Sequence, residues 1–446
     1  MVQTNYIVVI DLGTSHLVGM VGRKNANGTV AVLTEETEDS GSCIRRGNVY
    51  NVEETAKQIN RLVRKLQNKL GIQQPDFRIE KVYIGVGGQS LHSIEHSEVK
   101  ILPPDTAVSE EDVRSLDEQC SAYRPELLDV LGVSPPVYVV DDKPADNPVG
   151  ILGKRIEARY KLIVGRPSIR SSITKSIEKT QVRLAGIIVS PQALADAVLS
   201  PDEKELGCTL IDFGAGVTAV AIYKENALIH LSVIPLGGRL ITKDLTTLHL
   251  VESEAERLKI TYGSALISKD KETPATQGMI ESSGREIDPN EINLVIEARA
   301  REIVENVYAR VKTTGEMDSL GSGVILAGGA SALKNLQELV RQQFKQDVRY
   351  ATIRKDRIEG HNEMAGNPDY MTAISLLING TENCVSHYVA PLPKEDPVAV
   401  VQDPVVVVED TDAGTRKSAD KGKRKKKGKG NGWGLFGKFD EIFDVD

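Results

Sequence analysis

Residues 7–19 read IVVIDLGTSHLVG, and they decide the fold because they recur in altered form as TLIDFGAGVTAVAI at residues 209–222. In each copy an apolar run leads into an Asp and a glycine turn, and a second apolar run follows. This pattern predicts a buried strand, a tight turn and a returning strand. Glycine lets a backbone approach a ligand closely, and the converging N–H groups of a turn can bind an anion. Two such hairpins facing each other would form a nucleotide clamp.

Each hairpin suggests specific ligand-binding residues. The first turn offers backbone and hydroxyl donors to phosphate from Gly13, Thr14 and Ser15, and the second offers Gly214, Ala215 and Gly216. Asp11 and Asp212 would face one Mg²⁺ ion through its waters, because Mg²⁺ gives up its hydration reluctantly. A single Asp-Gly turn is common and usually structural. The pair of turns is what favours a nucleotide site.

Bulk properties limit the class of protein. A chain of 446 residues is too long for one hydrophobic core, so we expect two or more domains. A net charge of −8 argues against a general nucleic-acid binder. No basic-then-apolar leader opens the chain and no apolar run approaches eighteen residues, so we expect a cytosolic protein without a membrane span. We also expect reduced thiols, because no C-x-x-C pair occurs among Cys43, Cys120, Cys208 and Cys384.

The first half of the chain predicts a three-stranded meander from residue 6 to 33, a helix and a strand at 81–86. Asn51 would cap the helix and Gly71 would end it. Residues 87–159 break this rhythm with paired prolines and predict an inserted subdomain. A strand at 160–164, a helix, and a strand at 185–189 then precede the second hairpin. The repeated unit predicts two α/β lobes with the ligand in the cleft between them.

The second half predicts helices at 242–247, 251–262 and 291–312, with a flexible polar loop at 264–290. GVILAGGA at 323–330 predicts a strand that enters a glycine turn, where an adenine could lie against bare backbone at Gly328, Gly329 and Ala330. Ser331 would cap the next helix. The folded part is expected to end near Gly380.

The last sixty residues differ in composition from the rest. Residues 385–430 predict a disordered linker. Between Arg416 and Lys429 this linker contains nine Lys or Arg residues and a single acidic residue, Asp420. Residues 431–446 predict an amphipathic helix. It could dock on its own domain or bind a partner, but the adjoining basic run favours an anionic membrane, at roughly 1 kcal/mol per Lys or Arg. The membrane-facing side chains would be Trp433, Leu435, Phe436, Phe439, Ile442 and Phe443.

These motifs together resemble the actin, Hsp70 and sugar-kinase ATPase superfamily. DLGTSHL is similar to its first phosphate loop, DFGAGVT to its second and AGGAS to its adenosine loop, while PQALADAVL at 191–199 and PDYMTAISLL at 368–377 resemble its two linking helices. EAERLKITYG at 254–263 resembles the helix whose Glu and Lys contact ribose and border adenine, here Glu256 and Lys259. The alternative for that pair is a surface ion pair one helical turn apart.

Within the superfamily the chain resembles the bacterial actin-like cell division family FtsA. NPVGILGKRIEARY at 147–160 is similar to the end of that family's inserted subdomain 1C, and the C-terminus resembles its membrane-targeting sequence. The resemblance implies ATP-dependent filaments on the cytoplasmic face of the bacterial inner membrane at the division site, which tether the tubulin-like GTPase FtsZ and recruit later division proteins through subdomain 1C. It also places Arg299 where the C-terminal peptide of FtsZ would dock.

The chain departs from the family pattern at Ser375, where the second linking helix often has Gly, and in its long basic linker. No residue is identified as a base that activates water, so we expect at most slow ATP hydrolysis. The alternative is a chaperone-like or kinase-like ATPase of the same superfamily. A chaperone would need a β-rich substrate domain after the lobes, and a sugar kinase would need a catalytic acid and sugar-binding insertions; the sequence shows neither.

The predicted fold class is α/β and actin-like: two ribonuclease-H-like lobes around a nucleotide cleft, inserted subdomains 1C and 2B, and a disordered tail that ends in an amphipathic helix. The predicted divisions are 1–86, 161–199 and 358–384 for subdomain 1A, 87–160 for 1C, 200–235 and 313–357 for 2A, 236–312 for 2B, 385–430 for the linker and 431–446 for the membrane helix.

Overall fold

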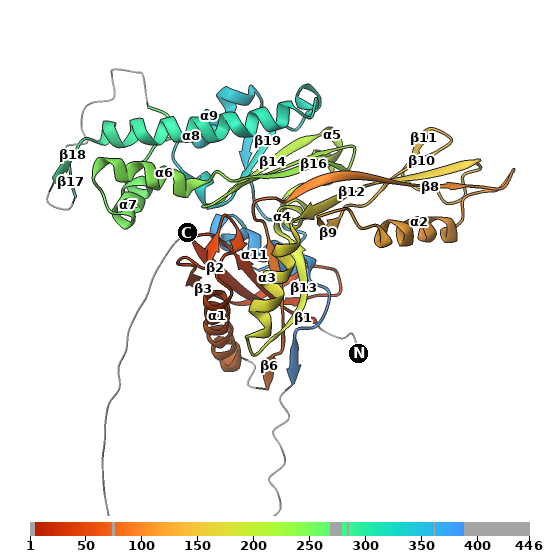
Figure 1. Ribbon diagram of the computed structural model, residues 1–446, viewed down its shortest axis with the longest axis horizontal. Coiled ribbons are helices and arrows are strands. Elements are labelled where there is room, and N and C mark those ends of the chain that lie inside the picture. Colours follow the sequence, from red (N-terminus) through yellow and green to blue (C-terminus); the bar gives the residue numbers. More distant parts are fainter. Residues whose placement is uncertain (1–4, 74–75, 268–278, 283–284, 361, 388–446) are drawn as a thin grey trace, which may run out of the picture. The chain divides into compact units, whose positions relative to one another are not determined.

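The computed structural model describes residues 5–73, 76–267, 279–282, 285–360 and 362–387, which Figure 1 draws as a coloured ribbon. Most of the predicted linker and the whole predicted membrane helix lie outside these ranges. Within them, no helix is both long and apolar enough to cross a membrane. The four cysteines are buried and form no disulfide.

The first lobe is built on a six-stranded sheet that begins with the quoted hairpin. The strand order is β13-β7-β1-β2-β3-β21, with β1 antiparallel to β2 and parallel to β7. The buried apolar run of β1 explains its central place, because both faces of the strand are covered. The bounds are β1 (Asn5–Leu12), β2 (His16–Lys24), β3 (Val30–Asp39), β7 (Lys81–Val86), β13 (Arg183–Val189) and β21 (Ile358–Glu359).

The second lobe repeats this topology. Its strands run in the order β16-β15-β14-β19-β20, which matches β3-β2-β1-β7-β13 strand for strand. β14 is antiparallel to β15 and parallel to β19, as β1 is to β2 and β7. The repeat predicted from the two hairpins is therefore present in the fold. The bounds are β14 (Cys208–Phe213), β15 (Thr218–Lys224), β16 (Ala227–Ile234), β19 (Val324–Ala327) and β20 (Val348–Tyr350).

Helices cover both sheets, and two of them lie between the lobes. α1 (Val52–Gln73) and α3 (Pro167–Glu178) pack together beside the first sheet. α4 (Ser190–Val198) and α11 (Pro368–Asn379) pack against each other. α11 also packs on the first sheet, and α4 contacts strands of both sheets. α8 (Pro289–Lys312) and α9 (Leu336–Phe344) pack on the second lobe (Figure 1). Short elements complete these lobes: β4 (Ile44–Arg45), β5 (Asn48–Val49), α5 (Pro201–Leu206), η2 (Met317–Ser319) and α10 (Asn362–Ala365).

The insert after β7 is a curved antiparallel blade with one helix. β8 (His92–Ile101) and β12 (Arg155–Gly165) form its long central pair, and α2 (Glu110–Ala122) packs beneath them (Figure 1). Shorter strands flank the pair: β9 (Asp129–Val133), β10 (Val137–Val140) and β11 (Lys143–Ala145). The base of β8 pairs with the edge strand β16, Ser232 opposite His92, so the insert extends the sheet of the second lobe.

The region after β16 corrects one prediction. Helices α6 (Gly238–Leu245), η1 (Thr246–Leu248) and α7 (Glu252–Tyr262) precede α8. The predicted loop at 264–290 contains a hairpin of β17 (Ile280–Ser282) and β18 (Arg285–Ile287). Its polar composition hid two isoleucines, Ile280 and Ile287, which are buried against the second core and hold the hairpin in place. Residues 268–278 of that stretch lie outside the described ranges.

Three predicted boundaries were also wrong: the end of α1, the N-cap of α9 and the end of the folded part. α1 is capped by Asn51 as expected, but it continues past Gly71, which does not adopt the left-handed conformation that ends a helix. Ser331 donates to the carbonyl of Gly328 within the short turn η3 (Gly329–Ala332), and Asn335 is the N-cap residue of α9. The fold continues past Gly380, because β22 (Val385–His387) pairs with β6 (Phe77–Ile79).

Candidate nucleotide site

The two hairpin turns occupy equivalent positions in the two lobes. Asp11 is the penultimate residue of β1, and Asp212 is the penultimate residue of β14. The second turn is closed by a hydrogen bond of 2.9 Å from the amide of Gly214 to the carbonyl of Val217. Each Asp therefore lies at the end of a central strand, two residues before a glycine, on the side of the sheet that faces the opposite lobe.

The two hairpin turns approach each other closely. A Cβ atom added to Gly216 would lie 2.4 Å from the hydroxyl oxygen of Thr14, so only glycine allows the loops to approach this closely. The Thr14 hydroxyl also accepts a hydrogen bond of 2.9 Å from the amide of Gly47, which ties the first loop to the segment between β4 and β5. The turns thus form a continuous wall across the cleft.

The two carboxylates carry perturbed pKa values. Burial, with a smaller contribution from the charge of Asp212, raises the pKa of Asp11 to about 7, against a lowering effect of the Ser190 hydroxyl 3.4 Å away. Burial raises the pKa of Asp212 to about 6. Burial is the main cause of both shifts, and the pKa of Asp11 is raised further by the charge of Asp212. A cation placed there would favour the ionised forms.

The donor set fits a hydrated Mg²⁺ ion better than a fully protein-bound metal. In the described ranges no group of three or more His, Cys, Asp or Glu side chains could hold a metal ion. Asp11 and Asp212 supply carboxylate oxygens from two sides, and the remaining ligands of Mg²⁺ would be waters and phosphate oxygens, which is its usual coordination in nucleotide sites.

The other end of the pocket is lined by α6 and α7. Lys259 donates to the Glu256 carboxylate at 2.7 Å, to the Thr242 hydroxyl at 2.9 Å and to the Gly238 carbonyl at 3.2 Å. Thr242 also donates to Glu256. The pair predicted from the Glu-x-x-Lys spacing is therefore an ion pair, and it lines the pocket as well.

The turn after β19 completes the pocket. Gly328 has φ of 83°, and a Cβ atom there would lie 2.3 Å from the Asp212 carboxylate. Glycine is therefore required both for the left-handed backbone and for the close approach. Gly329 and Ala330 follow in η3 and line the pocket.

These features enclose one cavity of about 600 Å³ between the lobes. It brings together all thirteen predicted nucleotide and metal residues: Asp11, Gly13, Thr14, Ser15, Asp212, Gly214, Ala215, Gly216, Glu256, Lys259, Gly328, Gly329 and Ala330. Arg299 lies outside it, on α8, where it pairs with Asp244 and Glu302. Trp433 and the other predicted membrane residues lie outside the described ranges.

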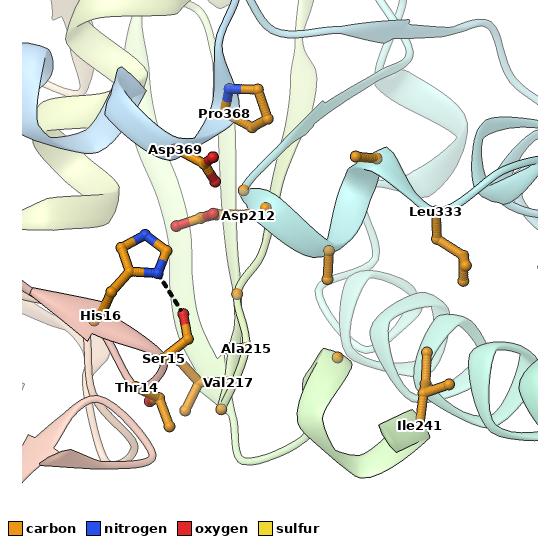
Figure 2. A pocket seen from close by; sticks show the side chains of 18 of the residues that line it. Thr14, Ser15, His16, Asp212, Ala215, Val217, Ile241, Leu333, Pro368 and Asp369 are labelled. Carbon is orange, nitrogen blue, oxygen red and sulfur yellow. Dashed lines mark hydrogen bonds between the residues drawn. The ribbon is translucent and has the colours of Figure 1, made fainter. Parts of the chain in front are cut away.

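The structure adds residues that the motifs did not indicate. Figure 2 shows His16, Asp212 and Asp369 facing the same part of the pocket, with the ring of His16 hydrogen-bonded to the Ser15 hydroxyl at 2.9 Å. Gly238 and Lys334 also line the cavity. Two of these residues carried a signal in the sequence: His16 lies within the quoted hairpin, and Gly238 belongs to a glycine pair after a strand. Asp369 lies in the quoted motif at 368–377, which was assigned to a linking helix and not to the site. Lys334 carries no local signal, because only the fold brings it to the site.

Comparison with known proteins decides the family. The family model "Cell division protein FtsA" matches residues 209–375, and the model "SHS2 domain inserted in FTSA" matches residues 88–164. The cell division protein FtsA of Porphyromonas gingivalis is 35% identical over 384 residues, covering 85% of this chain and 79% of that protein. The chain belongs to the FtsA family. The FtsA of Pseudomonas aeruginosa is 31% identical over 382 residues, covering 84% of this chain and 89% of its own length.

The fold comparison agrees with the predicted fold class. The PilM–PilN type IV pilus biogenesis complex contains a chain that matches with a TM-score of 0.57 at 16% identity, covering 84% of this chain and 98% of that one. At this identity the likeness concerns the fold alone. Together with the strand order, it confirms the predicted actin-like α/β architecture of the described residues.

Proposed function

We propose that this FtsA-family protein binds ATP with Mg²⁺ in the cavity between its lobes and acts in cell division as a nucleotide-dependent filament. The observation that carries the proposal is the pair of facing turns, each with a carboxylate, phosphate-binding glycines and a hydroxyl or amide donor. Mg²⁺, when bound, neutralises phosphate charge, and the two Asp side chains would hold its hydration shell. Glu256 and Lys259 orient the nucleoside end.

The role of the nucleotide is to hold the two lobes together. Thr14 and Gly216 come from different lobes, and both would contact the same phosphate chain. A bound triphosphate would therefore favour one relative position of the lobes, and subunits with a fixed shape polymerise more readily. We infer that hydrolysis of the bound ATP is at most slow.

The same proposal places the filament on the cytoplasmic face of the inner membrane at the division site. The amphipathic pattern of residues 433–443 and the basic run before it support an anionic-membrane anchor. Subdomain 2B would bind the C-terminal peptide of FtsZ near Arg299. The guanidinium of Arg299 already pairs with Asp244 and Glu302, so an acidic peptide would exchange with these carboxylates.

The experiment that tests this function is co-sedimentation of the full-length protein with anionic liposomes, with and without Mg-ATP and with and without FtsZ. We expect the protein to sediment with vesicles, to form ATP-dependent polymers there and to bring FtsZ into the pellet. A protein that binds vesicles but leaves FtsZ in the supernatant would refute the anchoring role. Failure to bind ATP by calorimetry would refute the nucleotide role separately.

A further inference from the structure

A second cavity, of about 770 Å³, lies behind the phosphate loops. Thr14, Ala215 and Gly216 line both this cavity and the nucleotide pocket, so the loops form a shared wall. The remaining walls come from residues 41–50, Gln89, Ser90 and the start of α3, and, in the second lobe, from Pro235, the start of α6 and Glu252. A ligand here would contact both lobes without occupying the nucleotide pocket.

The cavity has a strong excess of positive charge. Five of its lining side chains are basic, Arg45, Arg46, Arg166, Arg239 and Lys243, and one is acidic, Glu252. Glu252 pairs with Arg239 at 2.7 Å. Among the described residues no carboxylate pairs with any of the other four basic side chains. Five minus one leaves four uncompensated positive charges, in a chain whose net charge is −8.

The partners of these cations leave their charges available. Arg45 stacks its guanidinium 3.6 Å from the ring centre of Tyr50, a contact that orients the group without neutralising it. Arg46 donates to the amide oxygen of Gln89 at 3.3 Å. Arg166 is the N-cap residue of the twelve-residue helix α3 and forms no side-chain cap, so the positive end of this helix also borders the cavity.

Two further observations at the wall point to a ligand. The hydroxyl oxygen of Ser90 is buried and has no hydrogen-bond partner. A buried hydroxyl without a partner is costly, and a bound acceptor would satisfy it. Ser90 also has φ of 81° and Arg46 has φ of 49°, although neither is glycine. Such strain concentrates at functional sites, where the surrounding structure maintains it.

We propose that this cavity is a second anion site, which binds a small phosphate-bearing solute with several negative charges. Phosphate oxygens only accept hydrogen bonds when ionised, which matches a wall of guanidinium, ammonium and hydroxyl donors. The donors surround a cavity instead of following a groove, so a compact solute fits better than an extended acidic peptide. Because the ligand would bridge the lobes through loops that also contact nucleotide, the two sites are coupled.

Two sources could supply this chemistry. One is the phosphate released from a bound nucleotide, and this part of the inference rests on the proposed function. The other is a phosphorylated solute that enters from solution. Orthophosphate and tripolyphosphate separate the two, because a site for released phosphate would bind orthophosphate nearly as well, whereas a polyanion site would strongly favour tripolyphosphate.

The test uses the full-length protein saturated with Mg-ADP, so that the nucleotide pocket is filled. Calorimetry with tripolyphosphate should show one further site per chain, whose affinity falls as salt is raised. Arg166→Gln should weaken this binding about tenfold, the usual effect of losing one charge-assisted hydrogen bond. Arg64→Gln is the matched control, since Arg64 is exposed on α1, lies outside the cavity and forms no ion pair with another described residue.

The control should bind tripolyphosphate like the wild type, and all three proteins should bind ADP equally. Absence of a second site in the ADP-bound protein would overturn the proposal, as would equal weakening by Arg64→Gln. If the wild-type protein does not bind ADP, the proposed function is refuted instead. A second variant, Ser90→Gly, removes the unpartnered hydroxyl and the strained side chain. It should retain the melting temperature yet weaken tripolyphosphate binding, which a purely structural role of Ser90 would not produce.

Discussion

Two carboxylates dominate the site at the scale of single residues. Asp11 and Asp212 leave equivalent strands of the two lobes and are both pushed towards protonation by burial. The strands β1 and β14 are built mainly from buried apolar residues, so their stability does not depend on these two carboxylates. The carboxylates are instead placed where a bound cation would offset their repulsion, which is why this pair carries the nucleotide proposal.

The substitution Asp212→Ala tests that reading. It removes one of two protein groups that would hold the hydration shell of Mg²⁺, so Mg-ATP affinity should fall at least about tenfold, or about 1.4 kcal/mol. Calorimetry gives the affinity directly. Asp318→Ala, which removes an exposed carboxylate that does not line the pocket, should leave the Mg-ATP affinity unchanged. Equal Mg-ATP affinity in the two variants would refute the metal role.

Asp112 gives a pH-dependent prediction. Its carboxylate accepts hydrogen bonds from the amide and hydroxyl of Ser109 and pairs with Lys100 at 2.9 Å, and these contacts lower the pKa of Asp112 to about 2. A lowered pKa means that the stabilisation is complete above the ordinary value of 3.8 and is lost as pH falls towards 2. Asp112→Asn should therefore destabilise α2 by about 1 kcal/mol at pH 7.

Urea unfolding of the wild type and of Asp112→Asn from pH 7 down to pH 3 measures this difference. It should stay constant down to about pH 4 and shrink below it. A difference that persists unchanged at pH 3 would mean that the capping hydrogen bonds, and not the carboxylate charge, stabilise the helix.

At the scale of elements, local patterns predicted what local forces determine. The strand β7 was predicted to the residue and α8 to within two residues at each end, because their apolar patterns are clear. The helices α4 and α11, which were predicted from their resemblance to linking helices, also agree to within two residues at each end. The errors fell where tertiary contacts decide. Ile280 and Ile287 form a hairpin only because a distant core buries them, and β22 forms only because β6 offers a free edge.

The candidate site follows the same division. All thirteen predicted nucleotide and metal residues line one cavity. Eleven of them lie in or beside short glycine-rich turns, whose local chemistry is visible in sequence, whereas Glu256 and Lys259 lie on α7 and were predicted from the resemblance of their helix. Asp369, Lys334 and the basic cavity were not predicted. Their members are scattered from Arg45 to Lys243 and beyond, and only the packing of two lobes brings them together. The roles of the thirteen residues in nucleotide and metal binding remain predictions.

The crossing of α4 and α11 supplies a prediction for this scale. Ser375 is fully buried in α11, which packs on α4, and its hydroxyl donates to the Met371 carbonyl at 2.7 Å. Ser375→Leu should overfill the crossing and lower the free energy of unfolding by about 1–3 kcal/mol. Ser375→Ala is the control, because the carbonyl it frees keeps its helical partner; its effect in urea unfolding should be below about 1 kcal/mol. Equal stability of the two variants would show that the crossing has spare room.

For the whole molecule, the prediction concerns the tail. Deleting residues 433–446 should release the protein from anionic liposomes and leave Mg-ATP affinity unchanged, because the deletion keeps every described residue that lines the nucleotide pocket. Sedimentation with vesicles measures the first effect and calorimetry the second. Vesicles of neutral lipid are the control for the charged linker. Unchanged sedimentation after the deletion would place the membrane contact elsewhere in the chain.

The pairing of β8 with β16 has a mechanical consequence. β8 is attached to the second lobe near its first residue, where His92 pairs with Ser232 and Ser93 accepts from the Leu231 amide, and it runs ten residues to Ile101 at the exposed end of the insert (Figure 1). At about 3.3 Å per residue this is a rigid arm of roughly 30 Å, stiffened by β12 along its length. Each degree by which the second lobe rotates at the base of the arm would move its tip by about 0.5 Å, so the insert would act as a lever that turns the state of the cleft into a displacement at the far end of the subunit.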